Sequence, residues 1–131
     1  MIELSSYLRR LHAEFDSIEA VAIADLDGNP LRTVPEEGAG TIGYCAAFGG
    51  IALRRLGVSE RLSGHAETQQ ITIQGTRNAI IARRLSNRLQ FVVALNGPYA
   101  AAEVQSAIVA TLEQLGAVLS QTYPSPTKGS A

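Results

Sequence analysis

The chain has 131 residues, a formal net charge of −1, 46% hydrophobic residues and a single cysteine. This length and this apolar share suit one folded domain with a packed core and exclude wholesale disorder. The balanced charge does not imply nucleic acid or acidic lipid as a partner, and one cysteine excludes an intramolecular disulfide framework, as expected in a reducing compartment.

The N-terminal residues also bear on location. MIELSSYLRR lacks the basic flank and apolar stretch of a signal peptide. No uninterrupted run approaches the roughly 20 apolar residues that a membrane helix needs. We therefore expect a cytoplasmic protein without membrane insertion.

The first expected element is an amphipathic helix over residues 2–16. Leu4, Leu8, Leu11 and Phe15 recur at helical spacing, with charged residues between them.

A β-hairpin is expected next. Residues 18–25 alternate β-branched residues with alanine, and Asp27-Gly28 is a strong signal for a hairpin turn. Residues 30–34 form the returning strand, in which a proline suits the first position.

A middle helix is expected over residues 40–57, although three glycines interrupt its pattern and each interior glycine costs about 1 kcal/mol relative to alanine. A helical wheel separates three faces. They are a core face of Ile42, Cys45, Leu53 and Leu56, a small face of Gly43, Ala46, Ala47 and Gly50, and an outer face of Tyr44, Phe48, Ile51 and Arg55.

The small face raises the question of what it packs against. Small residues at this spacing allow two helix backbones to approach closely, and the commonest arrangement in soluble proteins is a two-fold dimer. Two alternatives stay open. The glycines relieve crowding within one subunit, or Gly49-Gly50 breaks the helix into two.

Three strands and a helix complete the domain. Residues 65–74 alternate, residues 77–86 form the next strand, and residues 89–95 are nearly all apolar, as in a central strand covered on both faces. A long helix follows over about 99–121. The whole is an α+β domain around an antiparallel sheet. We expect this single domain to span residues 1–122, with a disordered tail over residues 123–131.

The order of these elements and several local phrases resemble the Roadblock family, which includes bacterial and archaeal regulators of small Ras-like GTPases. The phrases are LRRLHAEFDSIEAVAIADLDGNPL, the small-residue middle helix, ETQQITIQGTRNAIIARRLSNRLQFVVAL and AEVQSAIVATLEQL, which together run from about Leu4 to Leu119. The resemblance implies a profilin-like α-β-β-α-β-β-β-α sandwich, in which a five-stranded antiparallel sheet carries the middle helix on one face and the terminal helices on the other.

The resemblance also implies a homodimer, in which the middle helices pack side by side and the third strand pairs with its mate. The residues expected in this dimer interface are Gly43, Ala46, Ala47, Gly50, Thr68, Gln70 and Thr72. It further implies a non-enzymatic adaptor that docks on a small Ras-like GTPase and alters its hydrolysis without donating a catalytic group. The candidate docking residues on the paired middle helices are Tyr44, Phe48, Ile51, Arg54 and Arg55.

No catalytic, cofactor or metal site is expected. The Asp25-x-Asp27-Gly28 stretch begins like a calcium loop but lacks the other ligand positions, so a tight turn is favoured. The two histidines and Cys45 show no zinc spacing, and no phosphate loop ends in Gly-Lys-Ser/Thr, so the chain itself should not bind GTP.

Other functions stay as alternatives. One is a structural adaptor or a ligand-sensing module, with a cavity beside the small residues Ala22, Ala24, Ala79 and Ala82, although the same residues also allow tight helix packing. An enzyme using Cys45 or a histidine ranks last. An arginine finger at Arg54 or Arg55 is a further hypothesis.

Overall fold

The computed structural model describes residues 4–36, 45–46, 49–56, 64, 69–97 and 100–122, with side chains described up to residue 120. Its elements are helix α1 (Leu4–Glu14), strands β1 (Ile18–Asp25), β2 (Pro30–Val34), β3 (Gln70–Gln74), β4 (Ala79–Arg84) and β5 (Leu89–Leu95), and helix α3 (Ala102–Thr122). Residues 49–56 are also helical and are called the middle helix below. The expected tail lies outside the described residues.

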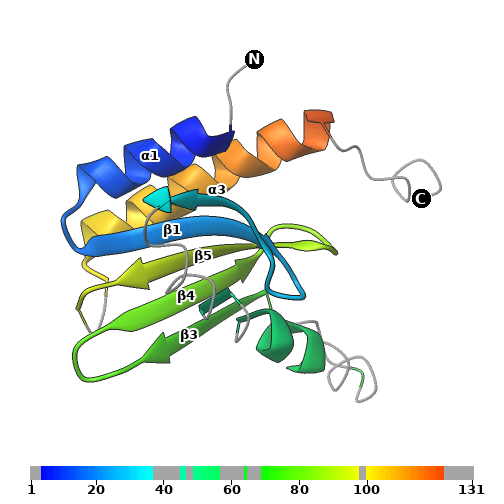
Figure 1. The fold of residues 1–131 in the computed structure, drawn as a ribbon, viewed down its shortest axis with the longest axis horizontal. Coiled ribbons are helices and arrows are strands. Elements are labelled where there is room, and N and C mark those ends of the chain that lie inside the picture. Colours follow the sequence, from blue (N-terminus) through cyan, green and yellow to red (C-terminus); the bar gives the residue numbers. More distant parts are fainter. Residues whose placement is uncertain are drawn as a thin grey trace.

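The five strands form one antiparallel sheet in the order β2-β1-β5-β4-β3 (Figure 1). Strand β5 is central, and its residues from Gln90 to Leu95 are all buried, which confirms the prediction from its apolar sequence. Strands β2 and β3 are the two edges of the sheet. The predicted fold class, a five-stranded antiparallel sheet with helices on both faces, is confirmed.

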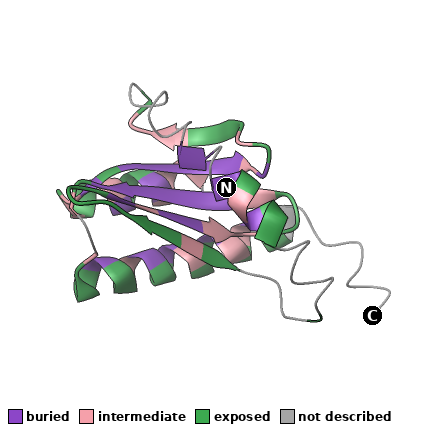
Figure 2. Cartoon of the chain, turned by 90° about the horizontal axis from the view of Figure 1, so that it is seen from below, coloured by how far each residue is buried: buried purple, intermediate pink, exposed green. Residues whose placement is uncertain are grey.

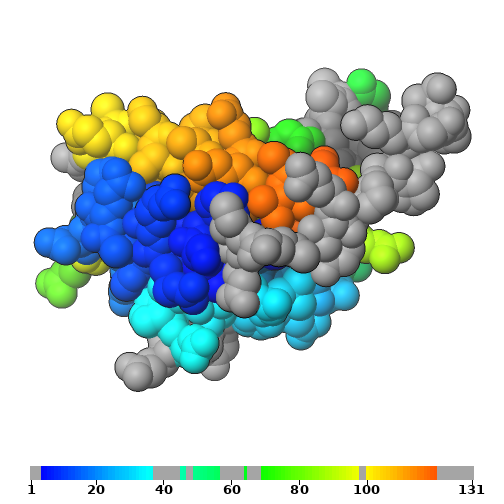
Figure 3. Space-filling view, turned by 90° about the horizontal axis from the view of Figure 1, so that it is seen from above, coloured from blue at the N-terminus to red at the C-terminus, as the bar shows by residue number. Residues whose placement is uncertain are grey.

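Alternation along β1 creates two unlike faces of the sheet. Its β-branched residues, Val21 and Ile23, point to the face that α1 and α3 cover. These two helices lie side by side there (Figure 3). The core on this side also contains Leu8 and Leu11 from α1, Phe91, Val93 and Leu95 from β5, and Val104, Ile108 and Leu115 from α3.

The other face of the sheet is lined by small side chains and carries the middle helix and the residues just before it. The buried cluster there consists of Ala20, Ala22, Ala24, Cys45, Ala46, Val92 and Ala94. A neighbouring cluster joins Leu53 of the middle helix to Leu26 and Ala82. Buried residues are therefore concentrated in the central strands and on the helix sides that face them (Figure 2).

Some expectations differ from the structure in detail. The helix expected over 2–16 ends at Glu14, and the helix expected over about 99–121 begins at Ala102. The strand expected over 77–86 spans only Ala79–Arg84, because Gly75 donates its N–H to the carbonyl of Asn78 (2.8 Å) and closes a turn. Of the strand expected over 65–74, residues 65–68 lie outside the described residues, Gln69 is described but not in the strand, and β3 begins at Gln70.

Leu56 was expected in the core but is exposed. It lies one turn beyond Leu53, the last residue of the middle helix that the sheet buries. Within the described chain, no helix combines the length and the apolar character needed to cross a membrane.

Candidate functional site

The middle helix packs directly on the sheet at its two glycines. A Cβ atom built on Gly50 would lie 2.3 Å from the backbone oxygen of Leu26, and one on Gly49 would lie 2.6 Å from the Cβ of Ala82. Real Cβ atoms do not approach other atoms so closely, so both positions require glycine. The first alternative of the sequence analysis, crowding within one subunit, thus accounts for Gly50.

Ala46 belongs to the same packed side, because it is fully buried against the alanines of the sheet. These two small-face residues therefore contact their own subunit. Gly43 and Ala47, the other small-face residues, lie outside the described residues.

A buried amide joins the sheet to the chain just before this helix. Gln90 of β5 is 0% exposed and points to the alanine-lined face. Its Nε2 donates to the backbone oxygens of Ala46 (2.7 Å) and Asp25 (2.9 Å). Because both of its partners are carbonyl oxygens, this atom must be the amide nitrogen and not the amide oxygen.

Gln90 was missed by the sequence analysis. Its signal was a lone polar residue in LQFVVAL, a strand expected to be covered on both faces. A buried amide in such a strand must find hydrogen-bond partners, and the nearest ones are backbone groups of the elements that cover the sheet.

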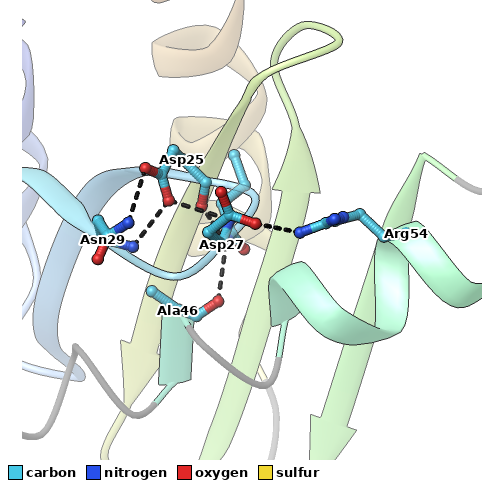
Figure 4. A network of polar contacts seen from close by, with 6 residues as sticks. Asp25, Asp27, Asn29, Ala46 and Arg54 are labelled. Carbon is cyan, nitrogen blue, oxygen red and sulfur yellow. Dashed lines mark hydrogen bonds and ion pairs between the residues drawn. The ribbon is translucent and has the colours of Figure 1, made fainter.

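The β1–β2 turn forms a second link to the middle helix (Figure 4). The Asp25 carboxylate accepts hydrogen bonds from the backbone N–H groups of Asp27 (3.0 Å) and Asn29 (2.8 Å) and from the Asn29 side chain (3.0 Å). Hydrogen bonds from Asn29, first from its backbone, hold the pKa of Asp25 below its ordinary value. The turn so ordered presents Asp27, which forms an ion pair with Arg54. The predicted tight turn in place of a calcium loop agrees with this arrangement.

A third link is made to Leu53, in the last described turn of the middle helix. Arg84 of β4 donates from Nη2 to the backbone oxygen of Leu53 at 3.0 Å. This charged donor ties the helix backbone to β4.

The outward side of the middle helix is the surface on which docking was expected. Ile51 is 50% exposed, and Arg55, one turn later, is exposed as well. Arg54 is exposed but paired with Asp27, whereas Tyr44 and Phe48 lie outside the described residues. We call Ile51, Arg55 and Leu56 the outer surface of the middle helix.

One face of the edge strand β3 lies on the same side of the sheet as the middle helix. Ile71 packs against the cluster of Leu53 and Leu26, so alternation puts Ile73, which is 45% exposed, on the face that carries the middle helix. Gln70 and Thr72, the interface candidates within β3, are exposed on the other face. Thr68 lies outside the described residues.

The backbone of β3 shows which groups face the open edge. Arg84 donates its N–H to Gln69, and Gly75 donates to Asn78, so the odd-numbered residues of this strand pair with β4. In an antiparallel ladder the orientation alternates. The N–H and C=O groups of Gln70, Thr72 and Gln74 therefore point away from the sheet.

Chemistry at the cysteine is disfavoured. Burial raises the pKa of the Cys45 thiol, so it stays protonated near neutral pH and is a poor nucleophile. Among the described residues, no group of three or more His, Cys, Asp or Glu side chains is placed to hold a metal ion.

The four alanines considered for a cavity lie on two faces of the sheet. Ala22, Ala24 and Ala82 are buried on the middle-helix face, which supports the alternative of tight helix packing there. Ala79 lies on the opposite face, where a groove of about 260 Å³ runs between α3 and the strands β3 and β4. Its lining includes Thr72, Gln74, Ala79, Ile81, Ile108 and Val109.

No protein-family model and no curated protein matches the chain. Solved structures do. Myxococcus xanthus MglB superposes with a TM-score of 0.76 at 14% identity, over 90% of this chain and 95% of that one. A Roadblock/LC7 domain from Streptomyces avermitilis gives a TM-score of 0.71 at 13% identity, over 90% and 98%. Profilin from Schizosaccharomyces pombe gives 0.56 at 14% identity, over 88% and 98%. The expected Roadblock fold, and its likeness to profilin, are thereby confirmed.

Proposed function

We propose that this protein is a dimeric, non-enzymatic cytoplasmic regulator that binds a small Ras-like GTPase and modulates its GTP hydrolysis or location. The observation that carries the proposal is the firmly seated middle helix with an exposed outer surface, on a Roadblock fold. Contacts with Arg84 and Asp27 and two close glycine contacts hold this helix, Gln90 binds Ala46 just before it, and Ile51 and Arg55 face outward.

The dimer is proposed to form through the open edge of β3. Antiparallel pairing of two copies about a two-fold axis keeps the faces of the two sheets aligned. Ile71 and Ile73 of each copy then meet on one face, and Gln70, Thr72 and Gln74 meet on the other. Apolar residues thus pair with apolar ones and amides with polar groups, so the edge is complementary to itself.

Docking of the GTPase is proposed at the outer surface of the middle helix. An exposed isoleucine beside an arginine suits a protein interface, where apolar and arginine side chains contribute most. Arg54 is less suited to act as an arginine finger, because it would first have to leave Asp27. Pairs at the surface are worth only about 0–1 kcal/mol, so this would hinder such a role without preventing it.

A ligand-sensing role has less support. The groove of about 260 Å³ beside α3 is smaller than the roughly 300–1,000 Å³ typical of small-molecule sites. Its lining also includes Gln70, Thr72 and Gln74 of the edge strand at which the dimer is proposed.

The test starts with affinity capture from a lysate of the source organism, with GDP or a non-hydrolysable GTP analogue, followed by hydrolysis assays on the purified GTPase that is identified. We expect capture to depend on the nucleotide, and Ile51→Asp to weaken binding at least tenfold, because it places a charge in the apolar part of the contact.

The matched control is Val109→Asp, which changes an exposed β-branched residue on α3, on the opposite side of the sheet. It should bind like the wild type. Recovery of no GTPase with either nucleotide, or equal loss of binding in both variants, would contradict the proposal.

A further inference from the structure

The groove beside α3 has apolar walls. Ala79 and Ile81 of β4, Leu95 of β5 and Ile108 of α3 line it, and each of them is at most 7% exposed. Val109, also in the lining, is an exposed apolar residue of α3. Among the described residues that line the groove, none carries a charge. The groove therefore suits an uncharged and largely apolar occupant, because a charged one would lose its water without gaining a partner.

The outer border of the groove is polar. It is formed by Gln70, Thr72 and Gln74, whose exposed side chains project from the edge strand β3 on the α3 face of the sheet. The backbone N–H and C=O groups of the same three residues point to the open edge. Because β3 is the last strand of the sheet (Figure 1), the groove of a single subunit ends at this row and lacks an outer wall.

The proposed pairing of two β3 strands would supply this wall. A two-fold axis at Thr72 places the two threonines opposite each other and Gln70 opposite the partner's Gln74, so the outward backbone groups of all three residues are paired. Neighbouring strands lie about 4.8 Å apart, so the two grooves become adjacent. Thr72 has the shortest side chain of the three, and the grooves therefore connect across the axis at this position.

The joined space has the size and the distribution of groups of a ligand site. One groove has a volume of about 260 Å³, below the roughly 300–1,000 Å³ typical of small-molecule sites, whereas two together lie within that range. Apolar walls stand at either side, below the two α3 helices. Amide and hydroxyl groups lie along the middle, where they can donate and accept hydrogen bonds.

We propose that the dimer contains a ligand chamber at its two-fold axis, formed by both grooves, which binds an uncharged and mostly apolar small molecule with hydrogen-bonding groups near its centre. This inference rests on the proposed dimer, since the chamber is incomplete in one subunit. The chamber lies on the α1 and α3 face of the sheet, opposite the proposed docking surface for the GTPase.

Nile red, an uncharged apolar dye whose fluorescence rises in apolar surroundings, serves as the probe. We expect saturable binding of one dye molecule per wild-type dimer. Val109→Asp places a charge in the wall of the chamber at a position that is exposed in the subunit, so it should weaken dye binding at least tenfold and leave the fold unchanged.

The matched control is Ile51→Asp, because Ile51 is a β-branched residue of similar exposure on the other face of the sheet. It should bind the dye like the wild type. Thr72→Pro, which blocks edge pairing, should lose saturable binding together with the dimer, because neither groove then has its outer wall.

Sedimentation velocity on the same samples distinguishes failure of the chamber from failure of the dimer. A wild-type dimer would overturn the chamber alone if it binds no dye, binds two dye molecules in separate grooves, or loses binding equally in Val109→Asp and Ile51→Asp. A wild-type protein that sediments only as a monomer would overturn the dimer and the chamber together.

Discussion

At Gly50, the helix backbone lies against the carbonyl of Leu26, and the neighbouring Gly49 covers the amide of Gln90. The sequence showed that these glycines needed a reason, since each costs helix stability. It did not show which surface they touch, because a wheel of small residues looks alike whether it meets a sheet or a second helix. The deciding residue, Gln90, lies 40 positions further along the chain, and a helical wheel contains no information about it.

Replacing Gly50 with alanine should therefore destabilise the protein. The new methyl group would collide with a backbone oxygen, which cannot rotate away as a side chain does. After about 1 kcal/mol of improved helix propensity is subtracted, we expect the free energy of unfolding in urea to fall by about 1–2 kcal/mol.

Gly116→Ala is the matched control in α3, where a Cβ would have no described atom within 4 Å. It should raise the free energy of unfolding by about 0.5–1 kcal/mol. Effects of the same sign in both variants would argue against close packing at Gly50.

Asp25 should make stability depend on pH. Its pKa is lowered in the folded state by hydrogen bonds from Asn29, so the carboxylate stabilises the fold above the unfolded pKa of about 4. This contribution is lost as pH falls through the folded pKa. The difference in unfolding free energy between wild type and Asp25→Asn should be largest at pH 5–7 and shrink by pH 3.

Urea unfolding at pH 7, 5 and 3 measures this difference. Asp16→Asn, at another exposed turn, controls for the loss of one negative charge. A difference that does not change with pH would show that the Asp25 carboxylate is not specifically held.

At the scale of elements, the sequence predicted most of the sheet well. The bounds of β1, β2 and β5 are as expected, since alternation, a hairpin turn and an apolar run define them. The alternation of β-branched residues and alanine in β1 places its larger residues on the α1 and α3 face and its alanines on the other. The candidate site was harder to predict, because Gln90, Arg84 and the β1–β2 turn meet the middle helix only after the chain has folded.

The edge strand allows a sharp test of the proposed dimer. Thr72→Pro removes an N–H that points to the open edge and is not used for pairing with β4. Proline is tolerated at such edge positions. We expect this variant to keep its fold by circular dichroism but to sediment as a monomer.

Thr72→Ala keeps the N–H and should remain dimeric. A dimer of Thr72→Pro with wild-type affinity would exclude the β3 edge as the interface.

At the scale of the whole molecule, the described residues under α1 and α3 form a core of large apolar side chains, whereas those on the middle-helix side are mostly smaller. The proposed docking surface and the exposed Ile73 lie on the middle-helix side, and the open edge borders on it. Assembly at this side would bury Ile51, Leu56 and Ile73, which are exposed in the isolated subunit. The stability of the protein should therefore depend on its concentration.

For a chain of this size, a hundredfold increase in concentration should raise the melting temperature of a dimer that unfolds to separate chains by about 5 °C. Differential scanning calorimetry of the wild type and Thr72→Pro measures this shift. The variant should show none, and a wild-type melting temperature independent of concentration would contradict obligate pairing.

The small residues under the middle helix limit how the protein can be redesigned. Gly49 lies directly against the Cβ of Ala82, so a larger residue at position 82 would push the helix away from the sheet. The groove beside α3 is the opposite case, since it has room to accept added volume. A more stable variant should be sought by placing larger side chains in the groove and keeping the alanines unchanged.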